Sequence, residues 1–214
     1  MTQQTPVSPW PQLRLDFYQT AVLLSRWQDD GRMTVYPVSV HDVVGACTHV
    51  ELSSGLLPPN TLFWQQQANQ PRLGIYVPAR RWRVQTAERR YYLPMPPFVF
   101  VGGGTAYQIF AVKKRPSGER DRLYHVPCPN VHGTGSICQG NTPFPIASPN
   151  THGVNMQQAL TLFMEESLFN GDLSQGKCQT YPDDVRQLWV ELDGRKRFPL
   201  SELMPTQMLL RQLM

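Results

Sequence analysis

The segment from Leu123 to Asn141 reads LYHVPCPNVHGTGSICQGN. It holds two cysteines, two histidines and two asparagines among several prolines and glycines. Because proline and glycine favour turns over a regular hydrogen-bonded ladder, we predict a loop whose shape comes from turn chemistry. Loops of this kind, held on a rigid scaffold, often carry reactive groups. The sequence on either side predicts what that scaffold is.

The chain before the loop is predicted to be mostly strand. Apolar and β-branched runs alternate with turn-forming residues, a pattern typical of hairpins. Pro78 and the Leu93–Pro97 segment interrupt the pattern, because proline cannot donate to a ladder. The predicted pairs are Leu13–Trp27 with Met33–Val40 around Asp29-Asp30-Gly31, Leu62–Gln66 with Arg72–Val77, and Phe98–Val101 with Tyr107–Val112 around Gly102-Gly103-Gly104. These pairs together predict a meandering antiparallel sheet.

The chain after the loop contains the clearest helix. We predict that it runs from about Met156 to Phe169, with Asn155 as its N-cap and Asn170-Gly171 as its stop. Its apolar residues recur at helical spacing and are Met156, Leu160, Phe163, Met164 and Leu168. A further hairpin is predicted over 188–200, and a weakly helical tail follows from Ser201. Strands followed by a helix indicate an α+β fold.

Length and composition favour one folded domain. The chain has 214 residues, of which 41% are hydrophobic and 17% charged, so the composition is not that of a disordered chain. We expect a flexible N-terminal arm over 1–11 and a single domain over 12–214 with a C-terminal extension from about 172. The richest apolar stretch, 93–104, is too short to cross a bilayer, and no secretory signal is visible. We therefore expect a cytoplasmic protein whose four cysteines are reduced.

The loop resembles the active-site stretch of ubiquitin-conjugating enzymes. In that family a His-Pro-Asn tripeptide precedes the catalytic cysteine at a fixed interval that ends in Gly-x-Ile-Cys, and here Asn130, Gly135 and Cys138 stand at that spacing. The upstream Pro94–Phe100 segment is similar to the proline-rich turn and strand that precede the loop in those enzymes. The layout resembles most a bacterial branch, the PRTRC system protein B group, in the elements Leu123-Tyr124-His125-Val126-Pro127, Asn130-Val131, Gly135–Gly140 and Phe163–Phe169.

The resemblance implies a ubiquitin-conjugating-like fold, in which an antiparallel meander and an active-site loop precede a packed helix. It implies that Cys138 carries a ubiquitin-like modifier as a thioester and passes it to a target nucleophile. Asn130 would steady the oxyanion or hold the loop in shape. Gly135 would let the backbone bend around the sulfur, and His125 and His132 would accept protons in support.

The same resemblance implies the partners. An activating, adenylating enzyme would supply the modifier and consume the ATP, and a JAMM-type metallopeptidase would act in the same pathway. The conjugating enzyme itself would need no cofactor and no metal. The resemblance leaves open whether the pathway is plasmid maintenance, antiviral defence or another. The chain departs from the family where Cys128 replaces the histidine of His-Pro-Asn, and the acid that many conjugating enzymes use to position an incoming lysine is not identified.

Two other classes of function fit parts of the sequence. A structural zinc site needs four ligands, and His125, Cys128, His132 and Cys138 could supply them. Their spacing is irregular for such a site. Alternatively, the protein is a non-catalytic interaction module, or it binds nucleic acid through the basic window from Arg80 to Arg90, which also holds Trp82. We expect nucleic acid and membranes not to be partners. Cys47, Cys128 and Cys178 are expected to be small apolar residues, and His41, His49 and His152 to be ordinary histidines.

Overall fold

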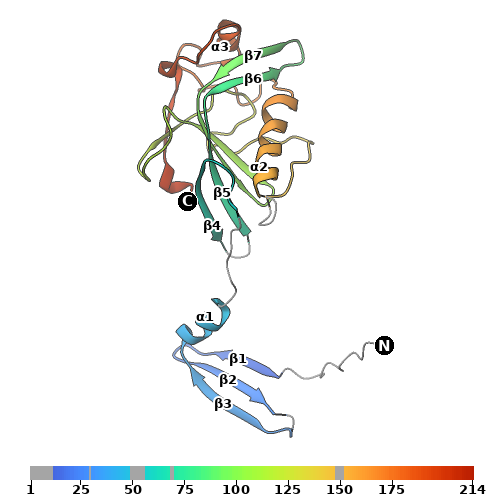
Figure 1. Cartoon of the computed structure of the whole chain (residues 1–214), viewed down its shortest axis with the longest axis vertical. Coiled ribbons are helices and arrows are strands. Elements are labelled where there is room, and N and C mark those ends of the chain that lie inside the picture. The colour runs from blue at the N-terminus through green and yellow to red at the C-terminus, as the bar shows by residue number, and fades with distance from the viewer. Residues whose placement is uncertain (1–11, 29, 49–55, 68–69, 148–151) are drawn as a thin grey trace, which may run out of the picture. The chain divides into compact units, whose positions relative to one another are not determined.

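The computed structural model describes residues 12–28, 30–48, 56–67, 70–147 and 152–214 (Figure 1). The chain divides into two compact units, Met1–Ser53 and Ser54–Met214. The single domain expected over 12–214 spans parts of both units. The arm expected over 1–11 lies outside the described residues.

The first unit is a three-stranded antiparallel meander followed by a helix. Its elements are β1 (Leu13–Phe17), β2 (Val22–Trp27), β3 (Met33–Val38) and α1 (Val40–Thr48). The predicted run from Leu13 to Trp27 is two strands, because the Tyr18 N–H donates to the Ala21 carbonyl at 2.8 Å and closes a turn between them. The pairing of β2 with β3 across the Asp-Asp-Gly cluster is confirmed.

The second unit is built on a six-stranded antiparallel sheet with the order β11-β10-β9-β8-β5-β4 and a separate β6-β7 hairpin. The predicted pairs that form β4-β5 and β8-β9 are confirmed. Pro94, expected to interrupt the pattern, lies inside β7, which belongs to the two-stranded sheet. The strands are β4 (Thr61–Gln67), β5 (Gln70–Val77), β6 (Arg80–Gln85), β7 (Arg90–Met95), β8 (Phe98–Gly103), β9 (Ala106–Ala111), β10 (Arg122–Tyr124) and β11 (Pro205–Leu209).

Both faces of the six-stranded sheet are buried at its centre, which explains the unbroken apolar run in β8. Phe98 and Phe100 belong to the larger core cluster together with residues of the helices, whereas Val99 and Val101 belong to a second cluster with Leu210 and Leu213. Alternate residues of one strand thus supply two cores. The segment from Tyr124 to Asn141, named the active-site loop after the family resemblance, continues from β10 of this sheet.

The helix after the loop begins earlier and ends earlier than predicted. It consists of α2 (His152–Thr161) and one π-helical turn, η1 (Leu162–Glu166), which ends where Ser167 adopts an extended backbone. Asn155 is not its cap, since its side chain donates to the Ile146 carbonyl from inside α2. Leu168 is not part of the buried stripe, because 59% of its surface is exposed. The burial of Met156, Leu160, Phe163 and Met164 is confirmed.

The hairpin predicted over 188–200 is wrong, because 185–192 forms the helix α3 (Val185–Leu192). Asp184 caps α3 by accepting from the Arg186 N–H at 3.0 Å. The tail is strand β11 flanked by two short 3-10 turns, η2 (Leu200–Glu202) and η3 (Leu210–Gln212), rather than a weak helix. Val185, Leu188, Trp189 and Leu192 complete the larger core cluster.

The α+β class and the antiparallel sheet are confirmed. In the described part of the chain, the helices are too short and too polar for any of them to cross a bilayer.

Candidate functional site

The active-site loop contains a small hairpin that extends the sheet. Val131 bridges Ile137 in antiparallel fashion, and the Gly135 N–H closes the turn by donating to the His132 carbonyl at 2.9 Å. The hairpin docks on β9, since the Ile137 N–H donates to the Tyr107 carbonyl at 3.0 Å and the Ile109 N–H to the Gly135 carbonyl at 2.9 Å. The loop therefore has a fixed backbone although it lies outside the named strands.

Cys138 follows this hairpin directly and is exposed. Its N–H donates to the Asn130 carbonyl at 2.8 Å, so the two ends of the predicted motif meet in space. The preceding Ile137 is buried and anchors the strand beneath the thiol. On the other side, the Gln139 side chain donates to the Thr105 carbonyl at 2.8 Å. The thiol thus projects from a backbone that is held before and after it.

Asn130 holds the loop to the segment after η1. Its side-chain Nδ2 donates to the Leu168 carbonyl at 3.0 Å, and its N–H donates to the Asp172 carbonyl at 3.0 Å. Its φ of 59° lies in the left-handed region, which asparagine tolerates better than most residues. These contacts favour the loop-shaping role over the oxyanion role for this side chain.

Gly135 is required by two independent features of the turn. Its φ is 80°, a conformation that costs other residues free energy. A Cβ at this position would also overlap the ring of Phe110, which is buried on β9 beneath the turn. The predicted role of Gly135 in bending the loop therefore has a structural basis.

Side chains from the C-terminal region support the loop from below. The buried Lys177 Nζ donates to the Val131 carbonyl at 2.6 Å, and the Trp189 Nε1 donates to the Pro127 carbonyl at 2.9 Å. Cys128, which replaces the family's histidine, is fully buried, and burial raises the pKa of its thiol. Burial also lowers the pKa of the Lys177 ammonium. Cys128 therefore serves as a protonated core residue under the loop.

His125 and His132 occupy different environments. His132 is exposed at the turn of the hairpin. His125 is half-buried beside β11, where its backbone N–H donates to the Met204 carbonyl at 2.9 Å. Burial, together with the nearby Lys177 ammonium, lowers the pKa of His125. Among the described residues, neither imidazole forms a hydrogen bond with Cys138.

The lowered pKa of His125 predicts a loss of stability in acid. Below the ordinary histidine value of 6.5, the unfolded chain binds a proton that the folded chain resists, so the free energy of unfolding falls as the pH falls. We expect His125→Gln to reduce this slope below pH 6.5. Urea unfolding at several pH values measures it, with the exposed His132→Gln as the control substitution. An unchanged slope in His125→Gln would contradict the assignment.

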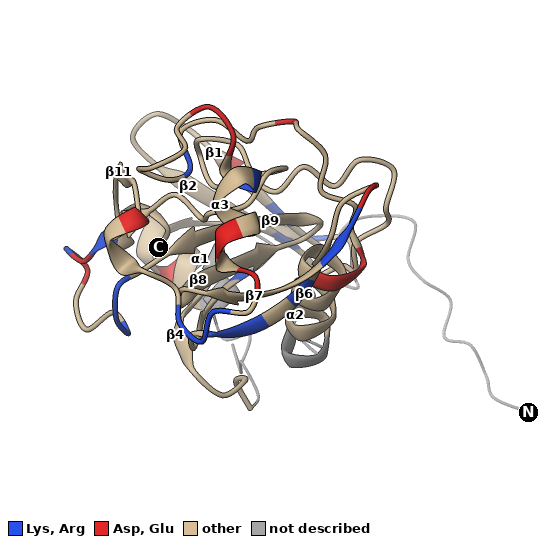
Figure 2. Ribbon diagram, turned by 90° about the horizontal axis from the view of Figure 1, so that it is seen from above, with Lys and Arg blue, Asp and Glu red and all other residues tan. Residues whose placement is uncertain are grey.

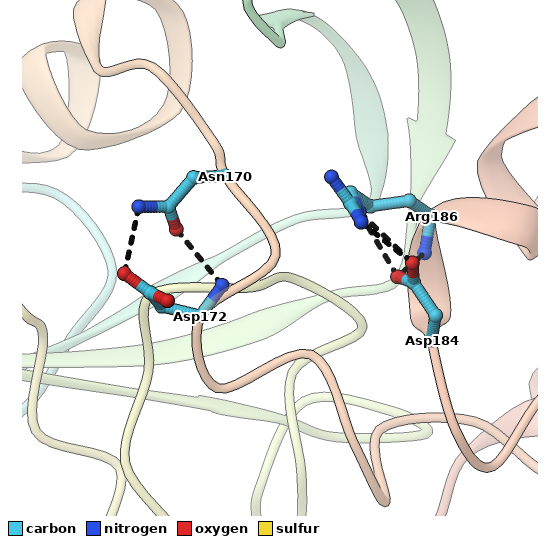
Figure 3. Close-up of polar contacts among 4 residues, drawn as sticks. All are labelled: Asn170, Asp172, Asp184 and Arg186. Atoms are coloured by element: carbon cyan, nitrogen blue, oxygen red, sulfur yellow. Dashed lines mark hydrogen bonds and ion pairs between the residues drawn. The ribbon is translucent and has the colours of Figure 1, made fainter.

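Asp172 is a candidate functional residue that the sequence analysis missed. It lies next to the active-site loop, because Asn130 donates to its carbonyl. Figure 3 contrasts it with Asp184. Among the described residues, the carboxylate of Asp172 accepts a hydrogen bond from the neutral Asn170 amide at 2.8 Å and forms no ion pair, whereas the Arg186 guanidinium donates to both oxygens of the Asp184 carboxylate. The Arg186 guanidinium lowers the pKa of Asp184. The sequence pattern marks Asn170-Gly171 as a helix stop and gives no signal for the acid that follows.

The zinc alternative is not supported. All four proposed ligands are described, yet among the described residues no group of three or more His, Cys, Asp or Glu side chains gathers in a way that could hold a metal ion. The four side chains differ in burial, since Cys128 is fully buried while Cys138 and His132 are exposed.

The basic window forms the β6-β7 hairpin, where Figure 2 shows segments of Lys and Arg. Arginine side chains stack on two of its aromatic rings. The guanidinium carbon of Arg80 lies 3.5 Å from the ring centroid of the fully buried Trp82, and that of Arg81 lies 4.1 Å from the ring centroid of Tyr92. Arg89 pairs with Asp193 at 2.6 Å. An arginine therefore lies over each of these two rings, while Tyr92 remains 47% exposed.

Comparison with known protein families identifies the family of the chain. A family model described as prokaryotic E2 family D matches residues 39–206. The match includes the active-site loop, α2, α3 and nearly all of the second unit, and it begins after β3. No curated protein and no solved structure matches the chain.

Proposed function

The chain belongs to the prokaryotic E2 family D, and from this premise we propose that it is a conjugating enzyme that carries a ubiquitin-like modifier as a thioester on Cys138. The proposal includes a ubiquitin-conjugating-like arrangement of the second unit around the active-site loop. The observation that carries it is the exposed thiol of Cys138 on a backbone bound to Asn130, at the spacing expected of the family.

Burial distinguishes Cys138 from the other thiols. Of the three cysteines whose side chains are described, Cys128 and Cys178 are buried and Cys138 is exposed. Burial raises the pKa of both buried thiols, so they stay protonated and do not exchange acyl groups. An acyl carrier must be reached by two proteins in turn, and Cys138 meets that requirement.

The proposed reaction has two steps. The Cys138 thiolate attacks the thioester carbonyl of the modifier on an activating enzyme, forms a new thioester and releases the enzyme's thiolate. A target amine then attacks this thioester, the carbon–sulfur bond breaks, and the Cys138 thiolate leaves as the amine loses its proton. The activating enzyme consumes the ATP before the first step. Asn130 acts here as a positioning residue, since its side chain is bound to the Leu168 carbonyl.

The test is reconstitution with the partners that the proposal requires. Incubation of the protein with its activating enzyme, the modifier and ATP is expected to give an adduct on non-reducing gels that a thiol reductant cleaves. An adduct that resists the reductant, or no adduct while the activating enzyme itself is charged, would contradict the proposal. A JAMM-type metallopeptidase is proposed to remove the modifier from its target, and its addition should reverse the final product.

We propose that Asp172 positions the incoming amine. The residue is exposed, its backbone carbonyl accepts from the Asn130 N–H of the loop, and its carboxylate forms no ion pair with the described residues. Asp172→Asn is expected to leave Cys138 charging unchanged but to slow transfer to lysine on the order of 100-fold, the contribution typical of a positioned acid–base group. Single-turnover discharge at several lysine concentrations measures this effect.

Asp183→Asn is the matched control, because Asp183 is also exposed and lies on the same C-terminal segment. Equal discharge rates for Asp172→Asn and Asp183→Asn would contradict a role of Asp172 in positioning the amine. Slower charging of Asp172→Asn would mean instead that the residue supports the loop.

A further inference from the structure

Strand β1 lies at an open edge of the three-stranded sheet in the first unit. The sheet order is β1-β2-β3, so β1 and β3 are its edges. β3 contains Pro37, which has no N–H and protects that edge from further pairing. β1, which reads LRLDF, contains no proline, so one side of its backbone has free pairing groups within the described sheet. An edge of this kind is a template for another strand.

Exposed apolar side chains are concentrated in the same unit. Of the 17 large hydrophobic residues found exposed in the described part of the chain, nine fall between Leu13 and Val44. On β1 itself, Leu13, Leu15 and Phe17 are exposed to 58%, 39% and 69%. They alternate along the strand and therefore share one face of the sheet, on which Leu15 pairs with Leu24 of β2. An apolar patch of this type indicates an interaction surface.

The charges on the opposite face indicate which strand fits this edge. Arg14 and Asp16 flank Leu15 and contact each other at 2.8 Å. If a second copy of β1 lies antiparallel with Leu15 opposite Leu15, each Arg14 faces Asp16 of the other copy. The apolar positions also match, because Leu13 then faces Phe17. The five-residue sequence is thus complementary to itself in one register only.

We propose that the chain forms a symmetric dimer through antiparallel pairing of β1 with β1 of a second copy, centred on Leu15. The two three-stranded sheets would join into one six-stranded sheet, and every contact would occur twice, as a two-fold axis requires. Opposite charges across neighbouring strands are favourable and like charges are unfavourable, so Arg14 and Asp16 would fix the register. The family match begins at residue 39, so this surface lies outside the part that carries the proposed chemistry.

Charge reversal on the full chain tests the proposal by sedimentation equilibrium. Arg14→Asp places aspartates opposite each other at two positions, and Asp16→Arg does the same with arginines, so each variant is expected to weaken the dimer about tenfold or more. Arg14→Asp/Asp16→Arg restores opposite charges and is expected to recover the wild-type dissociation constant. An equimolar mixture of the two single variants is expected to form a heterodimer.

Arg32→Asp is the matched control for Arg14→Asp, because it makes the same change in net charge at an exposed residue of the same unit that lies outside β1. The single variants are expected to fold, since Arg14 and Asp16 pair with the neutral Ser25 and Leu23 of β2. Circular dichroism checks that each variant is folded. If a charge-reversal variant unfolds, the neutral double variant Arg14→Gln/Asp16→Asn takes its place, and this double variant is expected to weaken the dimer. A wild-type chain that stays monomeric at all concentrations, or a double reversal as weak as the single ones, would overturn the proposal.

Discussion

Cys138→Ala is expected to abolish the reductant-sensitive adduct completely, because the substitution removes the only described thiol that is exposed. Cys138→Ser is expected to give an adduct that survives reductant, since a serine hydroxyl forms an oxygen ester that thiols cleave far more slowly. Charging assays with the activating enzyme, the modifier and ATP, read on gels with and without reductant, measure both outcomes. Mass spectrometry of the serine adduct then locates the attachment.

Cys128→Ala is the control for this experiment, since it removes the other thiol of the active-site loop. Cys128 is fully buried, so the variant is expected to lose about 1 kcal/mol of stability and to keep its ability to be charged. If Cys138→Ala still formed a cleavable adduct, the thioester would belong to another cysteine and the proposed function would have to be assigned to a different site.

Gly135→Ala is expected to cost about 2–5 kcal/mol of unfolding free energy, the second largest effect that the structure predicts. The positive φ contributes about 1–2 kcal/mol, and forcing a methyl group against the buried ring of Phe110 contributes about 1–3 kcal/mol. Because the turn sets the backbone of Ile137 and Cys138, any folded fraction is also expected to be charged more slowly. Urea denaturation measures the stability.

Gly133 provides the control within the same loop. A Cβ added at Gly133 would meet no atom within 4 Å, and its φ is outside the positive region. Gly133→Ala is therefore expected to change the stability by less than about 1 kcal/mol. Equal destabilisation by the two substitutions would show that the loop yields to a side chain at either position, contrary to the close contact with Phe110.

The hairpins and the position of the candidate thiol could be predicted from sequence because their determinants are local. β8 and β9 flank a glycine run, and the β2-β3 turn follows an Asp-Asp-Gly cluster, so short-range turn chemistry is enough to place them. The motif that links Asn130 to Cys138 is likewise read within nine positions of the chain, and the structure joins its ends by a hydrogen bond.

The elements that were missed depend on longer windows or on tertiary contacts. Leu188-Trp189-Val190 resembles a strand when read alone, but Val185, Leu188, Trp189 and Leu192 recur at helical spacing after the Asp184 cap. The start of α2 was placed too late because Asn155 resembles a cap, whereas tertiary structure uses it to bind the Ile146 carbonyl. Asp172 has no local signal at all, since its proximity to the loop depends on the backbone contact with Asn130.

The partners of the active-site loop have a consequence for biosynthesis. The carbonyl groups of Pro127 and Val131 are satisfied by Trp189 and Lys177, which lie 62 and 46 residues further along the chain. During translation the ribosome therefore releases the thiol-bearing segment well before the residues that complete its shape. A nascent chain that stops before α3 would present Cys138 on an unfinished loop, so the proposed acyl loading should await the synthesis of α3.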